Sequence, residues 1–507
     1  MNDHTVNRFY WIMIAITIII AFAFQGSRGL YETTEGRYTE TAREMIESGN
    51  YLEPTLGYRP HWTKPPLTYW AIAGGIKIFG RNEWGARFYN AIAFILTVLL
   101  VSQIGGLLWN KHVGIVAGII YSTSIFPVIA MNTVNTDTLL VLWETAAVFS
   151  YLKASSATKT KDGRKWGLVM WIFFGLGFLT KGPPALLPLL AILAWHYMNK
   201  KPWKLFTLLG IGLFLVVGFW WYAVVSFRHP GLLDYFLGQE LFARVATDSF
   251  HRNPEWYQPF TMYFPLLTIG AGFWFFYLIK TVMEKHLFSL KVLRDYLRAG
   301  KSGAFLSLWI SIPLIIFFIA QSRLPLYVLP LYVPVALIIG RGIGNKTSLQ
   351  TIILIAAISA IVLIGVKGLG KHYRQENNMK HVFSMLNNHN QEGLQVASYL
   401  ESKLYGLQFY LDGKLIRLSN RKTPWSDHIL ENFIDHKVKG DSTNKYILFT
   451  QQKFGDGLKN MLVAKDVDFK EYHHPGWRLF LTLPTNRTSN LCDGWCGEGA
   501  DSYYLRG

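Results

Sequence analysis

Long runs of apolar residues, separated by short polar turns, fill the first two thirds of this 507-residue chain. A helix that crosses a membrane needs about 20 predominantly apolar residues. Runs of about that length recur here, and Trp and Tyr cluster at their ends, as is typical of helix ends at a membrane interface. The pattern predicts about eleven to thirteen spans. The eleven that we assign cover residues 8–28, 85–108, 112–131, 137–154, 166–180, 183–199, 204–226, 260–281, 304–320, 324–341 and 350–366.

Three further segments are long and more polar. Residues 29–84 and 227–259 form two long loops between predicted spans. Within the first loop, Leu67–Phe79 is apolar but too short to span, so we expect a helix that lies on the membrane surface. Residues 367–507 mix period-two alternation with helical stretches, which predicts a small α/β domain. The strands that the alternation predicts are Gln395–Tyr399, Lys414–Leu418 and Tyr446–Thr450.

The fold class that follows is a polytopic α-helical membrane protein, residues 1–366, joined to a C-terminal α/β domain, residues 367–507. Composition agrees, because 51% of the residues are hydrophobic and only 16% are charged, whereas soluble domains carry about 25% charged residues. The net charge is +18, but the basic residues are spread over short turns and form no patch or motif for nucleic acid. We therefore expect membrane lipids, and no nucleic acid, as partners.

The basic residues also predict an orientation. They gather in every second short turn, and such turns lie on the cytoplasmic side of a membrane. The N-terminus is then cytoplasmic, and an odd number of spans places both long loops and the C-terminal domain outside. Lys181 and Arg323 are the two exceptions, since each stands alone in a short outer turn. Topology does not explain these cations, so they become candidates for function.

The first long loop offers two groups of candidates. Glu35 and Arg37 fall in a helical pattern, which is typical either of a solvated helix with Glu–Arg pairs or of a functional carboxylate at the membrane boundary. Lys64 precedes Pro65 and Pro66, which fix the backbone around it. This arrangement suits an anion site, or equally a lysine whose stem crosses an aromatic belt to reach water.

Two further candidates lie elsewhere on the outer side. Asp137 stands at the mouth of the fourth predicted span, where it can cap the helix or take part in chemistry. Tyr327 follows Arg323 by about one helical turn, so both side chains share one face. In the second long loop, His251 could ligate a divalent metal with a carboxylate of the first loop, although a single histidine more often is no ligand. The sequence assigns no cofactor and leaves this metal open.

In their order along the chain, these motifs resemble those of lipid-linked sugar transferases related to ArnT and to the protein O-mannosyltransferases. The resemblance covers about residues 10–345. It implies a GT-C-like fold and an inverting sugar transfer from a polyprenyl phosphate carrier, at the outer face of the bacterial inner membrane. The segments that carry it are Thr34-Glu35-Gly36-Arg37-Tyr38, Lys64-Pro65-Pro66, Thr136-Asp137, Thr180-Lys181-Gly182 and Ser322-Arg323-Leu324-Pro325 with Tyr327.

The resemblance also implies partners and roles. The donor is a polyprenyl-phosphate-linked sugar, and the acceptor is lipid A or another envelope glycan or protein. We expect a monomer whose C-terminal domain is periplasmic. The family usually carries acids where this chain has Thr34 and Thr63, and the second departure weakens the case for a metal. The roles that we predict are catalysis for Glu35 and Asp137, substrate binding for Arg37, Lys64, Lys181, Arg323 and Tyr327, and metal binding for His251.

Two other functions share part of the pattern. A flippase of lipid-linked sugars would carry ionisable residues deep inside its spans and an inverted repeat, whereas the ionisable residues here lie mostly at span mouths. A relative without activity that serves as a scaffold would explain the missing first acid. Movement of intact lipid-linked sugar without transfer would distinguish the flippase.

Overall fold

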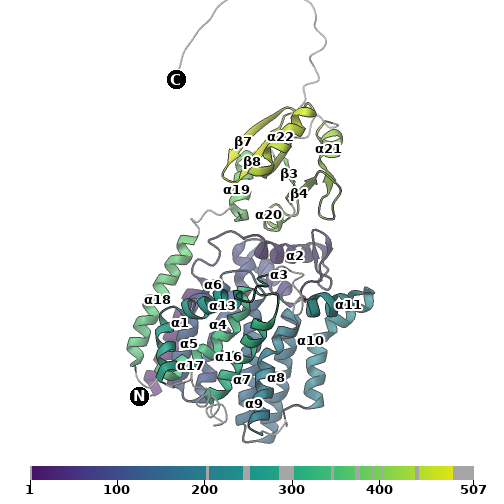
Figure 1. The fold of residues 1–507 in the computed structure, drawn as a ribbon. Helices are drawn as coiled ribbons and strands as arrows, with labels where there is room; N and C mark the ends of the chain where they lie inside the picture. Colours follow the sequence, from purple (N-terminus) through teal and green to yellow (C-terminus); the bar gives the residue numbers. More distant parts are fainter. Residues whose placement is uncertain are drawn as a thin grey trace, which may run out of the picture. The chain divides into compact units, whose positions relative to one another are not determined.

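The computed structural model describes residues 3–200, 205–243, 252–284, 302–343, 347–370, 377–390, 393–401, 403–439 and 445–483. His251, the predicted metal ligand, lies outside these ranges. The chain divides into two compact units, Met1–Lys380 and His381–Gly507. We call them the helical unit and the C-terminal unit; the colours of Figure 1 follow the chain from the first to the second.

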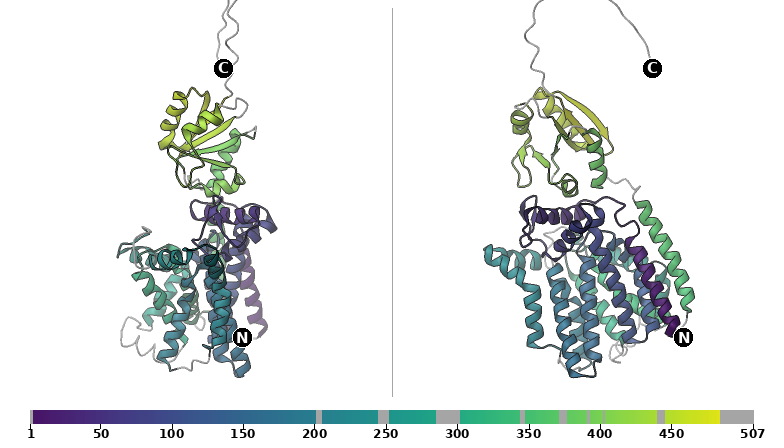
Figure 2. Two further views of the ribbon diagram at one scale, coloured as in Figure 1. Left: turned by 90° about the vertical axis from the view of Figure 1, so that its right-hand side faces the viewer. Right: turned by 180° about the vertical axis from the view of Figure 1, so that it is seen from behind.

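The helical unit is a bundle in which helices distant in sequence lie side by side (Figures 1 and 2). Its bundle helices, with the short 3-10 segments η1, η3 and η4 that join them, are α1 (Asp3–Phe22), α4 (Glu83–Leu108), α5 (Lys111–Ser122), α6 (Ile125–Met131), α7 (Asp137–Ser156), α8 (Thr160–Lys181), η1 (Pro183–Leu186), α9 (Leu187–Met198), α10 (Leu208–Arg228), α13 (Gln258–Ile269), η3 (Gly272–Trp274), α14 (Phe275–Glu284), α16 (Ser302–Ile319), η4 (Pro325–Leu331), α17 (Tyr332–Ile343) and α18 (Leu349–Leu369).

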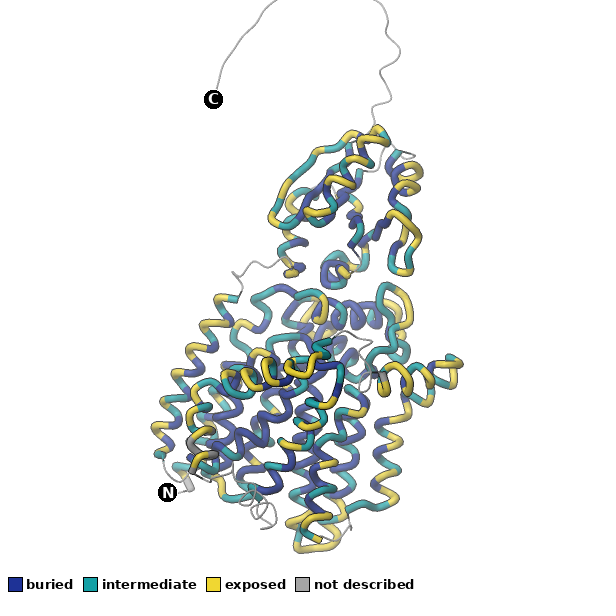
Figure 3. The backbone as a smooth tube through the Cα atoms, viewed as in Figure 1, coloured by how far each residue is buried: buried dark blue, intermediate teal, exposed yellow. Residues whose placement is uncertain are grey.

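Several of these helices are long and apolar enough to cross a membrane, so the chain is a polytopic membrane protein. Within the described residues, six helices qualify by length and hydropathy. Helices α5 and α6 are bent by 61° relative to each other, and if they form one broken span the number of candidate spans is seven. Many large apolar residues of these helices are exposed, as lipid-facing residues are. Figure 3 shows exposed and half-buried stretches along the helices at the edge of the bundle. The total of eleven spans stays a prediction, because helices such as α7 and α8 carry more polar residues than this criterion allows.

Two helices of the first long loop lie across one end of the bundle (Figure 2). They are α2 (Thr34–Ser48) and α3 (Leu67–Phe79), and the bounds of α3 are those that the sequence predicts. The two helices pack on each other, and α3 also packs on α4. A third segment of this region is the π-helix η2 (Tyr235–Ala243), which follows the short α11 (Leu232–Asp234). These elements position most of the polar side chains described below.

The C-terminal unit contains a six-stranded sheet in the order β5-β4-β3-β6-β8-β7. The first four strands are parallel, and the last two pair antiparallel. All three strands predicted from alternation are present, within one residue at each end. The strands and helices are β3 (Gln395–Tyr399), β4 (Leu415–Ser419), β5 (His428–Ile429), β6 (Tyr446–Gln451), β7 (Phe469–His474), β8 (Trp477–Thr482), α19 (Met379–His389), α20 (Tyr405–Tyr410), α21 (Leu430–Phe433), η6 (Ile434–Val438), η7 (Gln452–Phe454) and α22 (Gly455–Ala464).

Candidate active site

Asp137 and Lys181 form a buried ion pair. Asp137 is the first residue of α7 and Lys181 is the last residue of α8. Because these neighbouring helices run in opposite directions, the start of one lies beside the end of the other. The ammonium of Lys181 donates a hydrogen bond to Oδ1 of Asp137, and the two side chains are only 9% and 8% exposed. The structure thus brings together two site residues that the sequence places 44 positions apart.

Tyr327 covers the ammonium of this pair. Its ring centre lies 4.8 Å from Nζ of Lys181, a distance at which a cation is attracted to an aromatic face. Gly182 directly follows Lys181 and has a φ of 81°. A Cβ atom added at Gly182 would lie 3.1 Å from the hydroxyl of Tyr222. Two phenol rings, on η4 and α10, therefore lie beside the pair.

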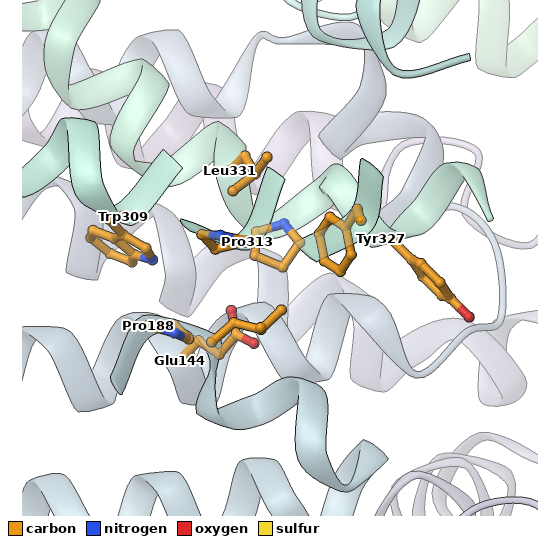
Figure 4. Close-up of a pocket in the computed structure, with 9 residues that line it drawn as sticks. Glu144, Pro188, Trp309, Pro313, Tyr327 and Leu331 are labelled. Atoms are coloured by element: carbon orange, nitrogen blue, oxygen red, sulfur yellow. The ribbon is translucent and has the colours of Figure 1, made fainter. Parts of the chain in front are cut away.

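Glu144 lies two turns along α7 from Asp137 and lines a small cavity (Figure 4). Trp309, Pro188 and Tyr327 are among the other lining residues, and the hydroxyl of Tyr327 is directed away from Glu144. Oε1 of Glu144 and the indole nitrogen of Trp309 are buried and have no hydrogen-bond partner among the described residues. Glu144 is not among the predicted site residues, although an acid inside an apolar run is a recognisable signal of a functional site.

Glu35 is buried in a network that binds both of its oxygens. The guanidinium of Arg28 donates at 2.6 and 3.1 Å, that of Arg87 at 3.0 and 3.1 Å, and the backbone amides of Tyr31 and Val134 at 3.0 and 2.8 Å. Burial by itself raises the pKa of Glu35, but the two adjacent positive charges and their hydrogen bonds outweigh it and lower the pKa to about 2. A carboxylate held in this way is a poor general base.

Lys64 faces an acid that comes from the second long loop. Its ammonium lies 3.4 Å from Oε2 of Glu240 on η2, and the hydroxyl of Tyr235 donates to the other oxygen at 3.3 Å. His61 lies close by. Burial, and then the charges of Arg37 and Lys64, lower the pKa of His61 to about 4. At neutral pH this imidazole is therefore uncharged, and the positive charge here belongs to Lys64 and Arg37.

Tyr38 connects these two groups of residues. Tyr38 follows Arg37 on α2. The guanidinium carbon of Arg37 lies 5.2 Å from the ring centre of Tyr38. Tyr38 also lies within electrostatic reach of Lys181. Arg37 and Lys64 are consequently on the same side of the bundle as the ion pair. We use the name polar site for this set of residues, which comprises Arg37, Lys64, Asp137, Lys181, Glu240 and Tyr327.

Arg323 is engaged by backbone carbonyls. Its guanidinium donates to the carbonyls of Phe317 and Phe318 at 3.2 and 3.0 Å, and to those of Asn253 and Glu255 at 2.8 and 3.1 Å. The side chain is 3% exposed. In this arrangement Arg323 joins the end of α16 to the second long loop. Its predicted contact with a phosphate stays a prediction, and the observed bonds favour a positioning role.

A metal site is not formed by the residues that the structure describes: no three His, Cys, Asp or Glu side chains come together among them. The hydroxyl of Thr63, at the position where the resemblance leads us to expect an acid, lies 2.8 Å from Nε2 of His61. Thr63 offers a weaker metal ligand than a carboxylate, so this pair does not strengthen the case for a metal.

Comparison with known proteins places these residues in a family. Residues 63–222, which contain Lys64, Asp137 and Lys181, match the family described as dolichyl-phosphate-mannose-protein mannosyltransferase. The chain is 29% identical over 344 residues to undecaprenyl phosphate-alpha-4-amino-4-deoxy-L-arabinose arabinosyl transferase 2 of Pseudomonas fluorescens. This match covers 67% of this chain and 60% of that protein. The chain is 32% identical over 348 residues to the corresponding transferase of Pectobacterium carotovorum, covering 66% and 58%.

The fold shows the same relationship. The crystal structure of ArnT from Cupriavidus metallidurans bound to undecaprenyl phosphate superposes with a TM-score of 0.75 at 15% identity, over 94% of this chain and 98% of that one. In sequence, the chain spans about 60% of the length of the first relative that it matches. The ordered motifs, the matched segment and the shared fold agree, and together they support an ArnT-like GT-C family for this chain.

Proposed function

We propose that this chain transfers a sugar from a polyprenyl phosphate carrier to an acceptor at the polar site. The observation that carries the proposal is the buried pair of Lys181 and Asp137 beneath the ring of Tyr327. A lysine held in such a position can exchange its carboxylate partner for the phosphate of a ligand. Arg37 and Lys64 add positive charge on the same side of the bundle, and a phosphate group is well bound by such cations.

The names of the relatives support a specific donor. They describe transfer of 4-amino-4-deoxy-L-arabinose from undecaprenyl phosphate. We therefore propose an undecaprenyl-phosphate-linked pentose as the donor of this chain. Apolar surfaces between the bundle and the helices α2 and α3 would hold the polyprenyl chain.

The reaction begins with the carrier phosphate as leaving group. The bond between C1 of the sugar and the phosphate oxygen breaks, and an acceptor oxygen attacks C1 from the opposite face, so the configuration inverts. Negative charge grows on the departing phosphate, and Lys181 with Lys64 and Arg37 stabilises it. Charges fixed in place before the reaction stabilise such a transition state most effectively.

The carboxylates of the site point to the kind of acceptor. Glu35 has a pKa of about 2 and six donors around it, and Asp137 is occupied by Lys181. Neither acid is well suited to removing a proton from a hydroxyl group. A phosphate acceptor is already ionised and needs no base, so we propose a phosphorylated glycolipid such as lipid A. Asp137 then acts by orienting Lys181.

We place the protein in the bacterial inner membrane with the polar site and the C-terminal unit in the periplasm. The distribution of lysines supports this orientation. Lys153 lies in the last turn of α7, at the end of the helix opposite to Asp137, and the turn that follows it is rich in basic residues. Basic turns face the cytoplasm, which leaves the polar site on the outer side.

The test is a transfer assay with purified protein and undecaprenyl phosphate that carries a radiolabelled pentose. Lys181→Met and Asp137→Asn are compared with Lys153→Met, which changes the same residue type at the other end of α7. We expect a loss of about 100-fold or more in kcat for the first two variants and little change for the third. Equal transfer by all three proteins would disprove the assignment. Movement of intact donor across the bilayer without transfer would instead indicate a flippase.

A further inference from the structure

The C-terminal unit has the strand order of a doubly wound sheet. Its first strand, β3, lies in the middle and pairs in parallel with β4 on one side and with β6 on the other. The chain passes from β3 to β4 and β5, then returns to β6, so the direction of winding reverses between β3 and β6. In open sheets of this kind, ligands bind outside the carboxyl ends of the strands at this reversal.

Glu401 lies at that position with half of its carboxyl group unused. It follows the last residue of β3 by two positions and is 9% exposed. Oε2 accepts a hydrogen bond from Nε2 of Gln451, the last residue of β6, at 3.1 Å. Oε1 is buried and has no partner among the described residues. Leaving a buried acceptor unpaired destabilises the fold, and the donor groups of a ligand would remove this penalty.

The surroundings of Glu401 indicate what those donors belong to. Burial raises the pKa of Glu401 to about 7, although the charge of Lys453 opposes this effect. The helical run of η7 and α22 begins directly after Gln451, and no side chain caps its start. The first amide of this run, that of Gln452, donates to the carbonyl of Gly476 at 3.0 Å. The rest of the first turn, together with the side chain of Lys453, favours a phosphate group. The acid and the amide of Gln451 favour hydroxyl or amino groups.

We propose that the carboxyl end of β3 and β6 binds a sugar phosphate. Glu401 and Gln451 would hold hydroxyl or amino groups of the sugar, while Lys453 and the start of the helical run would hold the phosphate. The chain after β3 reads Leu400-Glu401-Ser402-Lys403 and lacks the glycines of a dinucleotide-binding turn, which favours this smaller ligand. The proposal concerns the C-terminal unit alone and stands whether or not the helical unit transfers sugars.

Glucosamine 1-phosphate is a suitable probe, measured by calorimetry on the purified full-length protein. Glu401→Gln is expected to weaken its binding about tenfold, which corresponds to the loss of one hydrogen bond. The matched control Glu431→Gln changes an acid that is 58% exposed in the same unit and should leave binding unchanged. Thermal unfolding separates the roles. The side chain introduced by Glu401→Gln can still accept the hydrogen bond from Gln451, so replacing a ligand-binding acid should cost no stability, whereas replacing a structural acid should lower the unfolding temperature.

Further binding measurements identify the ligand and test whether it binds at the polar site of the helical unit instead. Binding should persist in Lys181→Met, and glucosamine and inorganic phosphate should each bind more weakly than the combined probe. Competition by a bisphosphorylated glucosamine disaccharide would point to an acceptor glycolipid, and competition by the polyprenyl-linked sugar would point to the donor. Either outcome supports the proposal. Absence of binding at millimolar probe, equal binding by Glu401→Gln, or binding lost in Lys181→Met would overturn it.

Discussion

Glu35 shows how the partners of a side chain define its role. The sequence places this acid where a catalytic residue is expected, but two arginines and two backbone amides bind it completely. Its two arginine partners, Arg28 and Arg87, lie 7 and 52 positions away. No periodicity predicts such a pairing across the fold, because contacts between distant segments depend on how the helices pack.

Replacing Glu35 should therefore reduce stability rather than change the chemistry. Glu35→Gln leaves two buried guanidinium groups without their anion, at a cost of about 3–5 kcal/mol in the free energy of unfolding. The folded pKa of about 2 lies below the usual pKa of a glutamate, about 4.5. The stabilisation is thus fully present above about pH 4.5 and is lost as the pH falls through 2. Thermal unfolding of both proteins between about pH 5 and 8 should show a constant difference; a difference that changes in this range would contradict the assignment.

His61 should also lower the stability of the protein in acid, but over a higher pH range than Glu35. Its folded pKa of about 4 is lower than the usual pKa of a histidine, about 6.5, so the unfolded chain binds the proton more readily. The stability associated with a neutral His61 is complete above pH 6.5 and is lost progressively as the pH falls toward 4. We expect His61→Asn to reduce the acid sensitivity of the unfolding temperature between about pH 7 and 5. An unchanged slope would show that His61 is not buried near Arg37 and Lys64.

At the scale of elements, the first long loop and the π-helix η2 meet through Lys64 and Glu240. The pair is 13% and 14% exposed, so its coupling should exceed that of a surface pair, which is about 0.2–1 kcal/mol. Lys64→Met should raise the KM for the donor, and Glu240→Gln in that background should change KM by less than it does alone. Steady-state kinetics of the unchanged protein, the two single variants and the double variant measure the coupling between the two side chains. Additive effects would show that the two side chains act independently.

The elements themselves follow well from the sequence. The helix Leu67–Phe79 has its predicted bounds, because a short apolar run between polar segments marks both of its ends. The three strands predicted in the C-terminal unit match to within one residue, because each shows a clear period-two alternation. The bend of 61° between α5 and α6 was not predicted, since the whole segment reads as one apolar run. Arg323 was predicted to bind phosphate because it stands alone in a turn, but its partners are backbone carbonyls that a sequence pattern does not reveal.

At the scale of the whole molecule, the orientation in the membrane can be measured directly. The only cysteines of the chain are Cys492 and Cys496, so a variant with serine at both positions is a clean background. In it, Arg59→Cys introduces an exposed thiol in the first long loop, and Lys159→Cys an exposed thiol between α7 and α8. A membrane-impermeant maleimide should label the first in intact cells and the second only after lysis. The reverse pattern would invert the proposed topology.

The central claim is that the carrier phosphate binds at Lys181 beneath Tyr327. The most direct measurement is a cryo-electron microscopy structure of this chain with undecaprenyl phosphate. We predict a phosphate oxygen within hydrogen-bond distance, about 3 Å, of Nζ of Lys181, with Lys64 and Arg37 nearby. A phosphate bound elsewhere, with Lys181 still held only by Asp137, would contradict the claim.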